Sequence, residues 1–420
     1  MDTFKTPAMA LAGFVAFAHA EDGTAAPNTT TAAPNAFNPA VSAIVDMFYY
    51  HEDSKEGMSH IKEGMTGFGG HGHEGDDHGH EHDHGYENGF NLRHIELAFS
   101  AEVDNYFKAL AVAAIAEEGA EIEEAWAETT GLPWGLQAKA GKFYSNFGYI
   151  NAQHAHEWDF ADQSLIYEQA LGMHGLNDLG VQVSWLAPTP VYLLFGAEIF
   201  RGENEKMYVQ ESDEGNPLPV NDNPRLGVGW VKIAPFQFDN SELQLGLFGA
   251  SGSHQEVHEE GTETEYFDGI NWFAGGDVVY KYDSGKAYGQ GDAVLQGEYF
   301  FRNKDLDLQG DEIGELTGKQ DGYYIQGTYG IFPRWRAGLR WDQVGLINEE
   351  QTPEGDINYG DSWRASAMVD FRPSEFSQIR FQVSNGDYEF MEEEEIMNEN
   401  VWEAFVQLTV SIGAHGAHSF

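Results

Sequence analysis

The sequence predicts an all-β protein, a transmembrane antiparallel β-barrel of about sixteen strands. Three observations support this class: apolar and polar residues alternate with a period of two, short and long connections alternate along the chain, and no apolar run is long enough for a membrane helix. A period of two puts one face of a strand against lipid and the other against polar groups or water. We expect short periplasmic turns, long extracellular loops and both termini in the periplasm.

The last strand shows this alternation most clearly. From Val401 to Ile412 apolar residues occupy every second position, and the chain ends on Phe420, which is in phase with them. A final strand of this kind resembles the last strand of bacterial outer-membrane barrels, in which the terminal aromatic residue is part of the signal read by the insertion machinery. The resemblance implies a location in the bacterial outer membrane and recognition of Phe420 by that machinery.

The N-terminus predicts export from the cytoplasm. Lys5 precedes an apolar run, Ala8 to Ala18, which is followed by the small-residue pattern Ala18-His19-Ala20. We interpret residues 1–20 as a signal peptide cut after Ala20, because the alternative, a membrane anchor, needs a longer run. Residues 21–37 are rich in Ala, Thr, Pro and Asn and are expected to form a flexible lead-in, so the barrel occupies residues 38–420.

Segments in which apolar and polar residues alternate, separated by turn-forming residues, predict where the strands begin. They start near residues 40, 91, 106, 119, 136, 179, 191, 225, 242, 268, 287, 321, 334, 361, 376 and 401. The tight Glu117–Gly119 link is the exception to the alternation of short and long connections. The long connections are expected at Glu52–Phe90, Ser145–Asp178, Arg201–Pro224, Ser253–Phe267, Asn303–Asp321, Leu346–Gly360 and Tyr388–Asn400.

The number of strands indicates that the sheet is closed and how wide the barrel is. An open sheet of this size would expose unpaired backbone groups to lipid, so the barrel must close. A barrel of about sixteen strands is wide enough to hold a water-filled channel. Two soluble β domains, with the apolar faces as their cores, are the alternative.

Composition narrows the function. The chain has no cysteine, which excludes thiolate metal sites, disulfides and a cysteine nucleophile. Its 22 Lys and Arg against 69 Asp and Glu give a net charge of −47, which argues against nucleic acid as a partner. This charge favours cations, or a surface bridged to outer-membrane lipid and lipopolysaccharide by divalent ions. None of the common catalytic motifs is present, so we do not expect an enzyme.

The first long connection contains the segment HGHEGDDHGHEHDHG. Imidazole and carboxylate together suit zinc and similar divalent ions, and flexible histidine tracts bind such ions without a fixed geometry. A solvated acidic loop with incidental metal affinity is the alternative, and no other cofactor is expected to be required. The candidate metal ligands are His71, His73, His78, His80, His82, His84, Asp76 and Asp77.

The connection Ser145–Asp178 is long and partly apolar, so it should pack against something. In general porins the corresponding third loop folds into the barrel and narrows it, and we expect the same here. Its polar residues are interpreted either as a second metal site or as hydrogen-bonding groups that line the pore. The residues concerned are His154, His156, Asp159 and Asp162.

Three consecutive late strands carry arginine on the face predicted to line the lumen. A basic wall that faces an acidic loop selects solutes by charge. Pairing of these arginines with Asp342 and Asp370, which would stiffen the wall, is compatible with that role. The predicted basic wall consists of Arg334, Arg336, Arg340, Arg364, Arg372 and Arg380.

Four stretches resemble a group of bacterial outer-membrane porin-like proteins, some of which carry the label of zinc-regulated TonB-dependent receptor. They are Phe37-Asn38-Pro39-Ala40, EIEEAWAETT (Glu121–Thr130), KFYSNFGYINAQHAHEW (Lys142–Trp158) and WLAPTPVYLLFGAEIFRG (Trp185–Gly202). The resemblance covers most of the chain after Phe37. Residues 21–37 leave no room for the plug of a TonB-dependent receptor, so a passive channel fits better than an energised receptor.

These observations lead to one functional expectation and one alternative. We expect a porin-like channel for passive diffusion of small hydrophilic solutes or ions, with divalent-metal capture by the histidine-rich extracellular loop. The alternative is a non-conducting outer-membrane barrel that acts as a surface metal-binding or structural protein. Porins of this size commonly form trimers, so analogy suggests a homotrimer.

Overall fold

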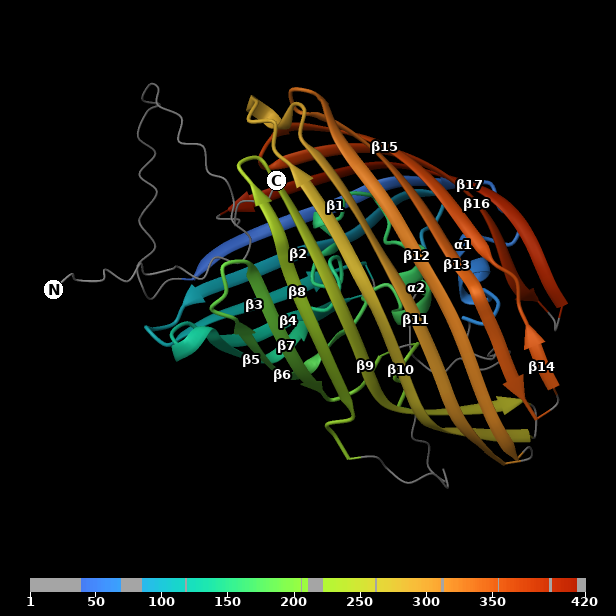
Figure 1. The fold of residues 1–420 in the computed structure, drawn as a ribbon. Helices are drawn as coiled ribbons and strands as arrows, with labels where there is room; N and C mark the ends of the chain where they lie inside the picture. The colour runs from blue at the N-terminus through green and yellow to red at the C-terminus, as the bar shows by residue number, and fades with distance from the viewer. Residues whose placement is uncertain are drawn as a thin grey trace, which may run out of the picture.

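The computed structural model describes residues 39–68, 85–117, 119–204, 206–210, 222–260, 263–310, 313–353, 355–392 and 395–413. Several sequence predictions lie outside the described residues: the signal peptide (1–20), the lead-in (21–37), the histidine-rich segment and the terminal Phe420. The described part forms one antiparallel sheet of seventeen strands (Figure 1). The sheet closes through the pairing of β1 (Ala40–Glu52) with β17 (Glu395–Gly413).

Sixteen of these strands make the barrel wall. β14 (Gly355–Asn358) pairs with the end of β13, while β13 also pairs directly with β15, so β14 is an addition at the rim. The predicted sixteen-strand antiparallel barrel is therefore confirmed. The other wall strands are β2 (Gly89–Glu102), β3 (Phe107–Ile115), β4 (Ala120–Thr129), β5 (Leu136–Tyr144), β6 (Asn177–Leu186), β7 (Tyr192–Phe200), β8 (Leu226–Phe238), β9 (Ser241–Glu260), β10 (Glu263–Tyr282), β11 (Ala293–Gly310), β12 (Gly314–Phe332), β13 (Trp335–Thr352), β15 (Ser362–Ser374) and β16 (Ser377–Glu392).

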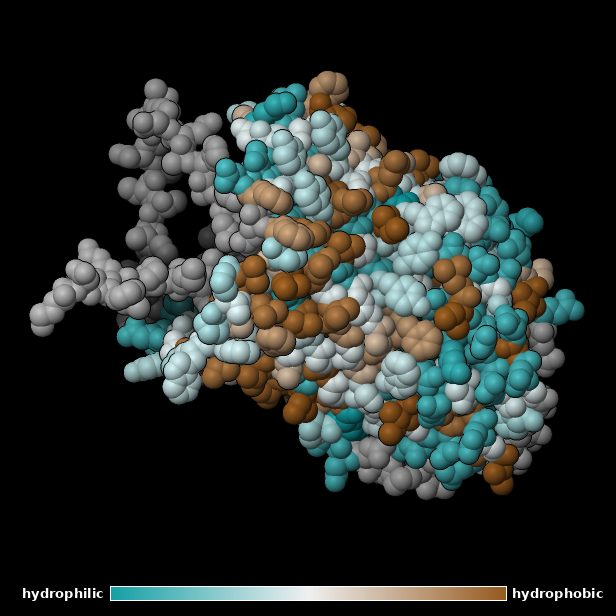
Figure 2. All heavy atoms as spheres, viewed as in Figure 1, coloured by the Kyte–Doolittle hydropathy of each residue, from teal (hydrophilic) through white to brown (hydrophobic). Residues whose placement is uncertain are grey.

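The apolar face of the strands points outward. In β17, Trp402 and Val406 are exposed, whereas Glu403 and Gln407 between them are buried inside the barrel. This is the reverse of a soluble β protein and is the arrangement that lipid requires. Figure 2 shows hydrophobic side chains over the middle of the wall and hydrophilic ones over the end opposite the short turns. No helix in the described part of the chain is long and apolar enough to cross a membrane.

Exposed aromatic residues mark the end of the barrel with the short turns. They lie on the turns and on the adjoining strand ends, including the short 3-10 helices η1 (Pro133–Gly135) and η3 (Ala287–Gly289). Aromatic side chains of this kind form belts at the membrane–water interface. The most exposed are Tyr106, Trp134, Phe238, Tyr288 and Phe332.

The predicted long loops on the later half of the barrel are wrong in part. β9 and β10 each have 20 residues and extend to Glu260 and from Glu263, so most of the predicted Ser253–Phe267 loop is a strand hairpin. The predicted loops at Asn303–Asp321, Leu346–Gly360 and Tyr388–Asn400 are likewise largely strand. In these extensions the outward face is acidic rather than apolar: Asp305 and Asp307 are exposed, whereas Leu306 and Leu308 between them are buried. The backbone ladder nevertheless continues beyond the lipid, as in the pairing of Glu392 with Glu395.

One strand, β11, starts several residues later than predicted. β11 begins at Ala293 rather than near residue 287, because the preceding turn contains η3. Tyr288 in that turn has a φ of 60°, a left-handed conformation that a strand cannot contain.

The described parts of three connections on the earlier half fold into the barrel. The first, residues 53–88, carries α1 (Met58–Glu63), and the second, residues 145–176, carries η2 (Ala155–Glu157) and α2 (Leu165–Leu171). The third, residues 201–225, contributes the buried side chains of Met207 and Tyr208. In Figure 1 both α-helices lie within the ring of strands.

The interior differs from the open, water-filled channel that the strand number predicted. Phe147 of the second connection packs against Phe248 and Phe273 of the wall, with ring centroids 5.0 and 5.1 Å apart. Leu165 and Tyr167 of α2 belong to the same buried apolar cluster. A large part of the lumen is therefore a packed core, because the inward connections bring apolar side chains to inward-facing aromatic residues.

Candidate functional site

The second connection, residues 145–176, is the element around which the candidate site is built, and we call it the inward loop. One anchor is the carboxylate of Glu298 on β11. It accepts hydrogen bonds from the backbone N–H groups of Tyr149 and Ile150 at 3.0 and 3.1 Å. It also accepts from the hydroxyls of Tyr167 and Tyr324 at 2.9 and 2.7 Å. Four donors on one buried carboxylate hold the start of the loop and α2 against the wall.

On one side the loop meets a group of charged residues that we call the arginine flank. Arg340 of β13 and Arg364 of β15 both bind Asp162, with Nη–Oδ distances of 2.6 and 2.9 Å. Both guanidinium groups also contact Asp342, at 2.8 and 3.3 Å. All four side chains are buried. The two positive charges neutralise the two negative charges. Buried charged side chains are costly unless they are paired in this way.

Two more arginines extend the arginine flank along the wall. Arg336 pairs with Asp370 of β15 at 2.7 Å and with Asp159 of the inward loop. Arg380 of β16 donates to the backbone carbonyl of Trp158 at 2.8 Å. The loop is therefore attached to three neighbouring strands through guanidinium groups.

The other two predicted basic-wall residues lie outside this flank. Arg372 lies near the turn end of β15, with its Nη2 4.0 Å from Asp370 Oδ2. Arg334 corrects the sequence prediction: it lies in the turn before β13, is exposed and stacks on the ring of Tyr288 at 4.5 Å. Its φ of 70° places it in the left-handed region, so the alternation of β13 does not extend back to it.

Two aspartates of the loop, Asp159 and Asp162, have lowered pKa values. Burial by itself would raise the pKa of Asp162, but the guanidinium groups of Arg340 and Arg364 outweigh this effect and lower the pKa. Burial also opposes the ionised form of Asp159, and Arg336 outweighs it in the same way, lowering the pKa of Asp159. Both aspartates were predicted, with His154 and His156, to form either a second metal site or hydrogen-bonding groups that line the pore. In the structure their charged partners are arginines.

The opposite side of the loop meets imidazole and carboxylate groups, which we call the histidine flank. His154 Nδ1 lies 3.1 Å from Glu96 Oε2 and 3.4 Å from Glu123 Oε2. Its other ring nitrogen, Nε2, lies 3.1 Å from Glu124 Oε2. His156 Nδ1 lies 3.1 Å from the same Glu96 oxygen. Three wall carboxylates thus converge on two histidines of the loop.

His94 completes the histidine flank. It lies on β2, two residues before Glu96, and its Nε2 is 3.9 Å from Glu96 Oε2. Two sets of three ligand atoms lie within 4.8 Å of one another and share Glu96, one with His94 and His156 and the other with Glu123 and His154.

Two β-bulges create this flank. In β2 the register against β1 passes from His94 to Leu92 and leaves out Arg93. In β4 the register against β3 passes from Glu124 to Ile122 and leaves out Glu123. A bulge lets two successive side chains point the same way, and both Glu123 and Glu124 are buried. A strict period of two would send one of them to lipid.

Further hydrogen bonds fix the carboxylates of the histidine flank. The Tyr144 hydroxyl donates to Glu123 Oε1 at 2.6 Å, and the Trp126 indole N–H donates to Glu124 Oε1 at 3.1 Å. Burial would lower the pKa of His154, but its bonds to the glutamates raise the pKa well above 6.5. Without a metal ion, His154 is therefore a cation that bridges the wall carboxylates.

Sequence reasoning identified only the loop half of this flank. It predicted His154 and His156 but missed the wall residues His94, Glu96, Glu123 and Glu124. The available signal was the adjacent Glu123-Glu124 pair inside a strand pattern, which breaks the period of two and indicates a bulge. The predicted ligands His71, His73, His78, His80, His82, His84, Asp76 and Asp77 lie outside the described residues.

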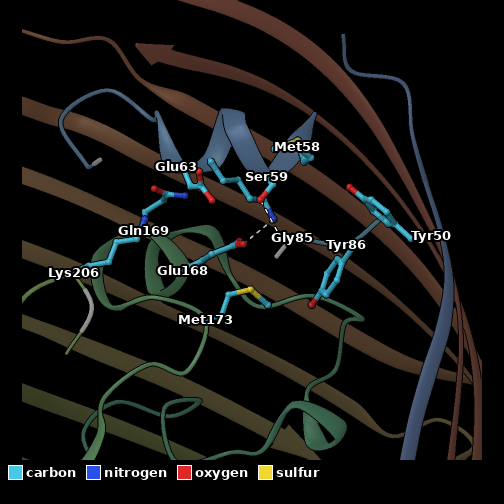
Figure 3. A pocket seen from close by; sticks show the side chains of 11 residues that line it. Tyr50, Met58, Ser59, Glu63, Gly85, Tyr86, Glu168, Gln169, Met173 and Lys206 are labelled. Carbon is cyan, nitrogen blue, oxygen red and sulfur yellow. Dashed lines mark hydrogen bonds and ion pairs between the residues drawn. The ribbon is translucent and has the colours of Figure 1, made fainter. Parts of the chain in front are cut away.

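A small cavity of about 30 Å³ lies between α1 and α2, lined by residues that include Tyr50, Tyr86 and Met173 (Figure 3). Beside it, Lys62 of α1 pairs with Glu168 of α2 at 2.8 Å. Burial would lower the pKa of Lys62, but Glu168 outweighs this effect and raises it. The ion pair ties the first connection to the inward loop across the lumen.

Comparison with solved structures supports the barrel. OmpT of Vibrio cholerae, an outer membrane protein folded in vitro, has a TM-score of 0.53 and 10% identity over 91% of this chain and 99% of that chain. The outer membrane channel DcaP of Acinetobacter baumannii has a TM-score of 0.53 and 12% identity, and the match covers 89% of this chain and 96% of that chain. A trimer form of the Vibrio cholerae OmpT has a TM-score of 0.51 and 10% identity, and the match covers 89% of this chain and 100% of that chain. These similarities show the fold and give no support to the TonB-dependent receptor label.

No model of a known protein family matches the chain. An uncharacterized protein of Aquifex aeolicus (strain VF5) is 37% identical over 395 residues, which cover 92% of this chain and 80% of that protein. The chain therefore belongs to the family of this Aquifex aeolicus protein, and its fold is that of the outer-membrane β-barrels.

Proposed function

We propose that the protein is a porin-like channel of the bacterial outer membrane for small hydrophilic solutes or ions, and that the inward loop limits its conductance. The observation that carries the proposal is the attachment of this loop inside a sixteen-strand barrel, between the arginine and histidine flanks. An apolar exterior with exposed aromatic residues at the turn end supports the membrane location. The similarity to an outer membrane channel supports the same class.

Two further features belong to this proposal. Short turns at the end where both described ends of the chain lie support a periplasmic position of the termini, because outer-membrane barrels have short periplasmic turns. A homotrimer is supported by the trimer form of the similar Vibrio cholerae protein. Outer-membrane lipid, lipopolysaccharide and the insertion machinery are the expected partners.

Metal capture by the histidine-rich segment is proposed from its composition alone. Deleting residues 71–84 should remove most Zn²⁺ binding measured by calorimetry near neutral pH, and it should leave the barrel intact because the deletion touches no described strand. Undiminished Zn²⁺ binding by the deletion variant would show that the metal binds elsewhere in the chain.

One observation favours a second candidate, a non-conducting barrel that serves as a surface metal-binding or structural protein. The apolar cluster formed by the inward loop and the wall fills much of the lumen. A packed interior of this kind would block solutes unless the loop moves.

Single-channel recording in planar bilayers separates the two candidates. We expect small conductance steps from the parent chain and larger or longer openings from Asp162→Asn, because this change weakens the bonds to Arg340 and Arg364. The matched control is Glu203→Gln, which weakens ion pairs with Arg201 and Arg225 on another connection. Silence of both the parent and Asp162→Asn would contradict the channel and favour the non-conducting barrel.

A further inference from the structure

The histidine flank has the properties of a metal site, and this does not depend on whether the barrel conducts. We infer that it binds one divalent metal ion of the zinc type, held by Glu96 of β2, Glu123 of β4 and His154 of the inward loop. The ligand atoms are Glu96 Oε2, Glu123 Oε2 and His154 Nδ1, which all lie within 4.8 Å of one another.

The spacing of these atoms fits a zinc-type ion. Ligands bound at about 2.0–2.2 Å in a tetrahedral site lie roughly 3.3–3.6 Å from each other. His154 Nδ1 is 3.1 Å from the oxygen of Glu96 and 3.4 Å from that of Glu123. Only small shifts of side chains would be needed to place an ion among the three.

The burial of Glu123 is an independent reason to expect a cation. The residue is 6% exposed, and its Oε2 atom makes no hydrogen bond. Among the described residues, the ion pairs of Glu96, Glu123 and Glu124 are all with histidines and none is with Lys or Arg. A buried carboxylate oxygen without a donor is costly unless a cation joins it. The ring of His154 approaches this oxygen to 3.4 Å without a hydrogen bond and is shared with Glu96 and Glu124, so negative charge is left for a divalent ion to balance.

The outer contacts match those of protein metal sites. A metal-binding histidine commonly gives its second ring N–H to a carboxylate, which fixes the ring, and here His154 Nε2 faces Glu124 Oε2 at 3.1 Å. The second oxygen of Glu123 is held by the Tyr144 hydroxyl at 2.6 Å. These contacts orient Nδ1 of the histidine and Oε2 of the glutamate toward Glu96.

The mixture of donors selects the class of metal. One imidazole and two carboxylates suit Zn²⁺ and neighbouring transition ions, whereas Ca²⁺ and Mg²⁺ prefer oxygen ligands alone. Since two ligands come from the wall and one from the inward loop, a bound ion would fasten the loop to β2 and β4. The arginine flank already fastens the other side without a metal.

The test uses the full chain, stripped with a chelator and titrated with ZnCl₂ in a calorimeter, with bound zinc counted after desalting. Glu123→Gln should bind one equivalent fewer than the parent, and Glu96→Gln should lose the same equivalent. The matched control is Glu128→Gln, a change to another buried glutamate of β4 that pairs with Lys108 and Lys139 instead of histidine. Because the histidine-rich segment is present in every variant, its contribution cancels in the differences.

Two further measurements keep the proposal open to refutation if a glutamate variant fails to fold. Tyr144→Phe leaves all three ligands in place and should weaken zinc binding at this site about 10- to 100-fold, as loss of an outer contact does. Crystals of the zinc-loaded chain should give an anomalous peak between Glu96, Glu123 and His154. Equal zinc counts in the parent, Glu123→Gln and Glu96→Gln would overturn the proposal. Loss in His94→Gln but not in Glu123→Gln would overturn the ligand assignment.

Discussion

The arginine and histidine flanks hold the same loop by different chemistry. On the arginine flank the cations are guanidinium groups, which stay charged at any physiological pH and match the carboxylates of Asp162 and Asp342 in number. On the histidine flank the carboxylates of Glu96, Glu123 and Glu124 face imidazoles, whose charge depends on protonation or a metal ion. One flank is therefore a permanent attachment, and the other can be changed by its surroundings.

The largest expected effect comes from removing a cation of the arginine flank. Arg364→Ala should lower the free energy of unfolding by about 3–5 kcal/mol, because it leaves buried carboxylates of Asp162 and Asp342 with one partner fewer. Urea unfolding of the detergent-solubilised barrel measures this change. Arg334→Ala, in an exposed turn, is the control and should change stability by no more than about 1 kcal/mol. If the two changes lowered the free energy of unfolding equally, the buried ion pairs of the arginine flank would not stabilise the barrel as we propose.

On the histidine flank the corresponding change is smaller. Tyr144→Phe removes one hydrogen bond to the buried Glu123 and should destabilise the metal-free barrel by about 1–3 kcal/mol. Tyr106→Phe, at an exposed position, is the control and should be close to neutral. If Tyr144→Phe destabilises as much as Arg364→Ala, the two flanks do not differ as described.

Ion selectivity should depend on a residue that remains in contact with solvent. The side chain of Arg336 is 20% exposed, whereas that of Arg364 is fully buried. We expect Arg336→Ala to shift selectivity toward cations, because it removes a lumen cation without removing the pairs of Asp162. The reversal potential under a salt gradient, compared with Arg334→Ala, measures this shift. An unchanged reversal potential would contradict an arginine role in selectivity.

The smallest expected effect is the response of the arginine flank to moderate acid. Because the folded-state pKa of Asp162 is lowered, its stabilisation is present above the unfolded pKa of about 3.9 and is lost as the pH falls through the folded value. The stability difference between the parent and Asp162→Asn should therefore stay constant from about pH 8 to pH 5 and shrink only below about pH 4. A decline between pH 8 and pH 5 would show that other groups control this flank.

The sequence predicted the barrel because lipid imposes a regular pattern on the strands. Trp402 and Val406 alternate with Glu403 and Gln407, and the structure places the first pair outward and the second inward. Beyond the membrane that constraint ends. The extensions of β9 to β13 therefore lack a continuous apolar outward face, and loops were predicted there instead of strands.

The candidate site was predictable only in part, for a related reason. Arg340 and Arg364 follow the strand period, so their inward direction could be derived. Glu123 lies on a bulge, which appears in the sequence only as a break in the period of two, and its approach to His154 depends on how the inward loop folds across the barrel. The predicted position of Arg334 was wrong because this residue has a positive φ and lies in the turn, so the strand begins one residue later than the pattern indicates.

The central claim is that the inward loop is packed inside the barrel, and thiol labelling tests it most directly because the chain has no cysteine of its own. Ala170→Cys places a thiol on α2 at a fully buried position, and Ala152→Cys places one at an exposed position of the same loop. Under native conditions a water-soluble maleimide should label Ala152→Cys rapidly and leave Ala170→Cys protected until the barrel is unfolded. Equal labelling rates at the two positions would contradict the account.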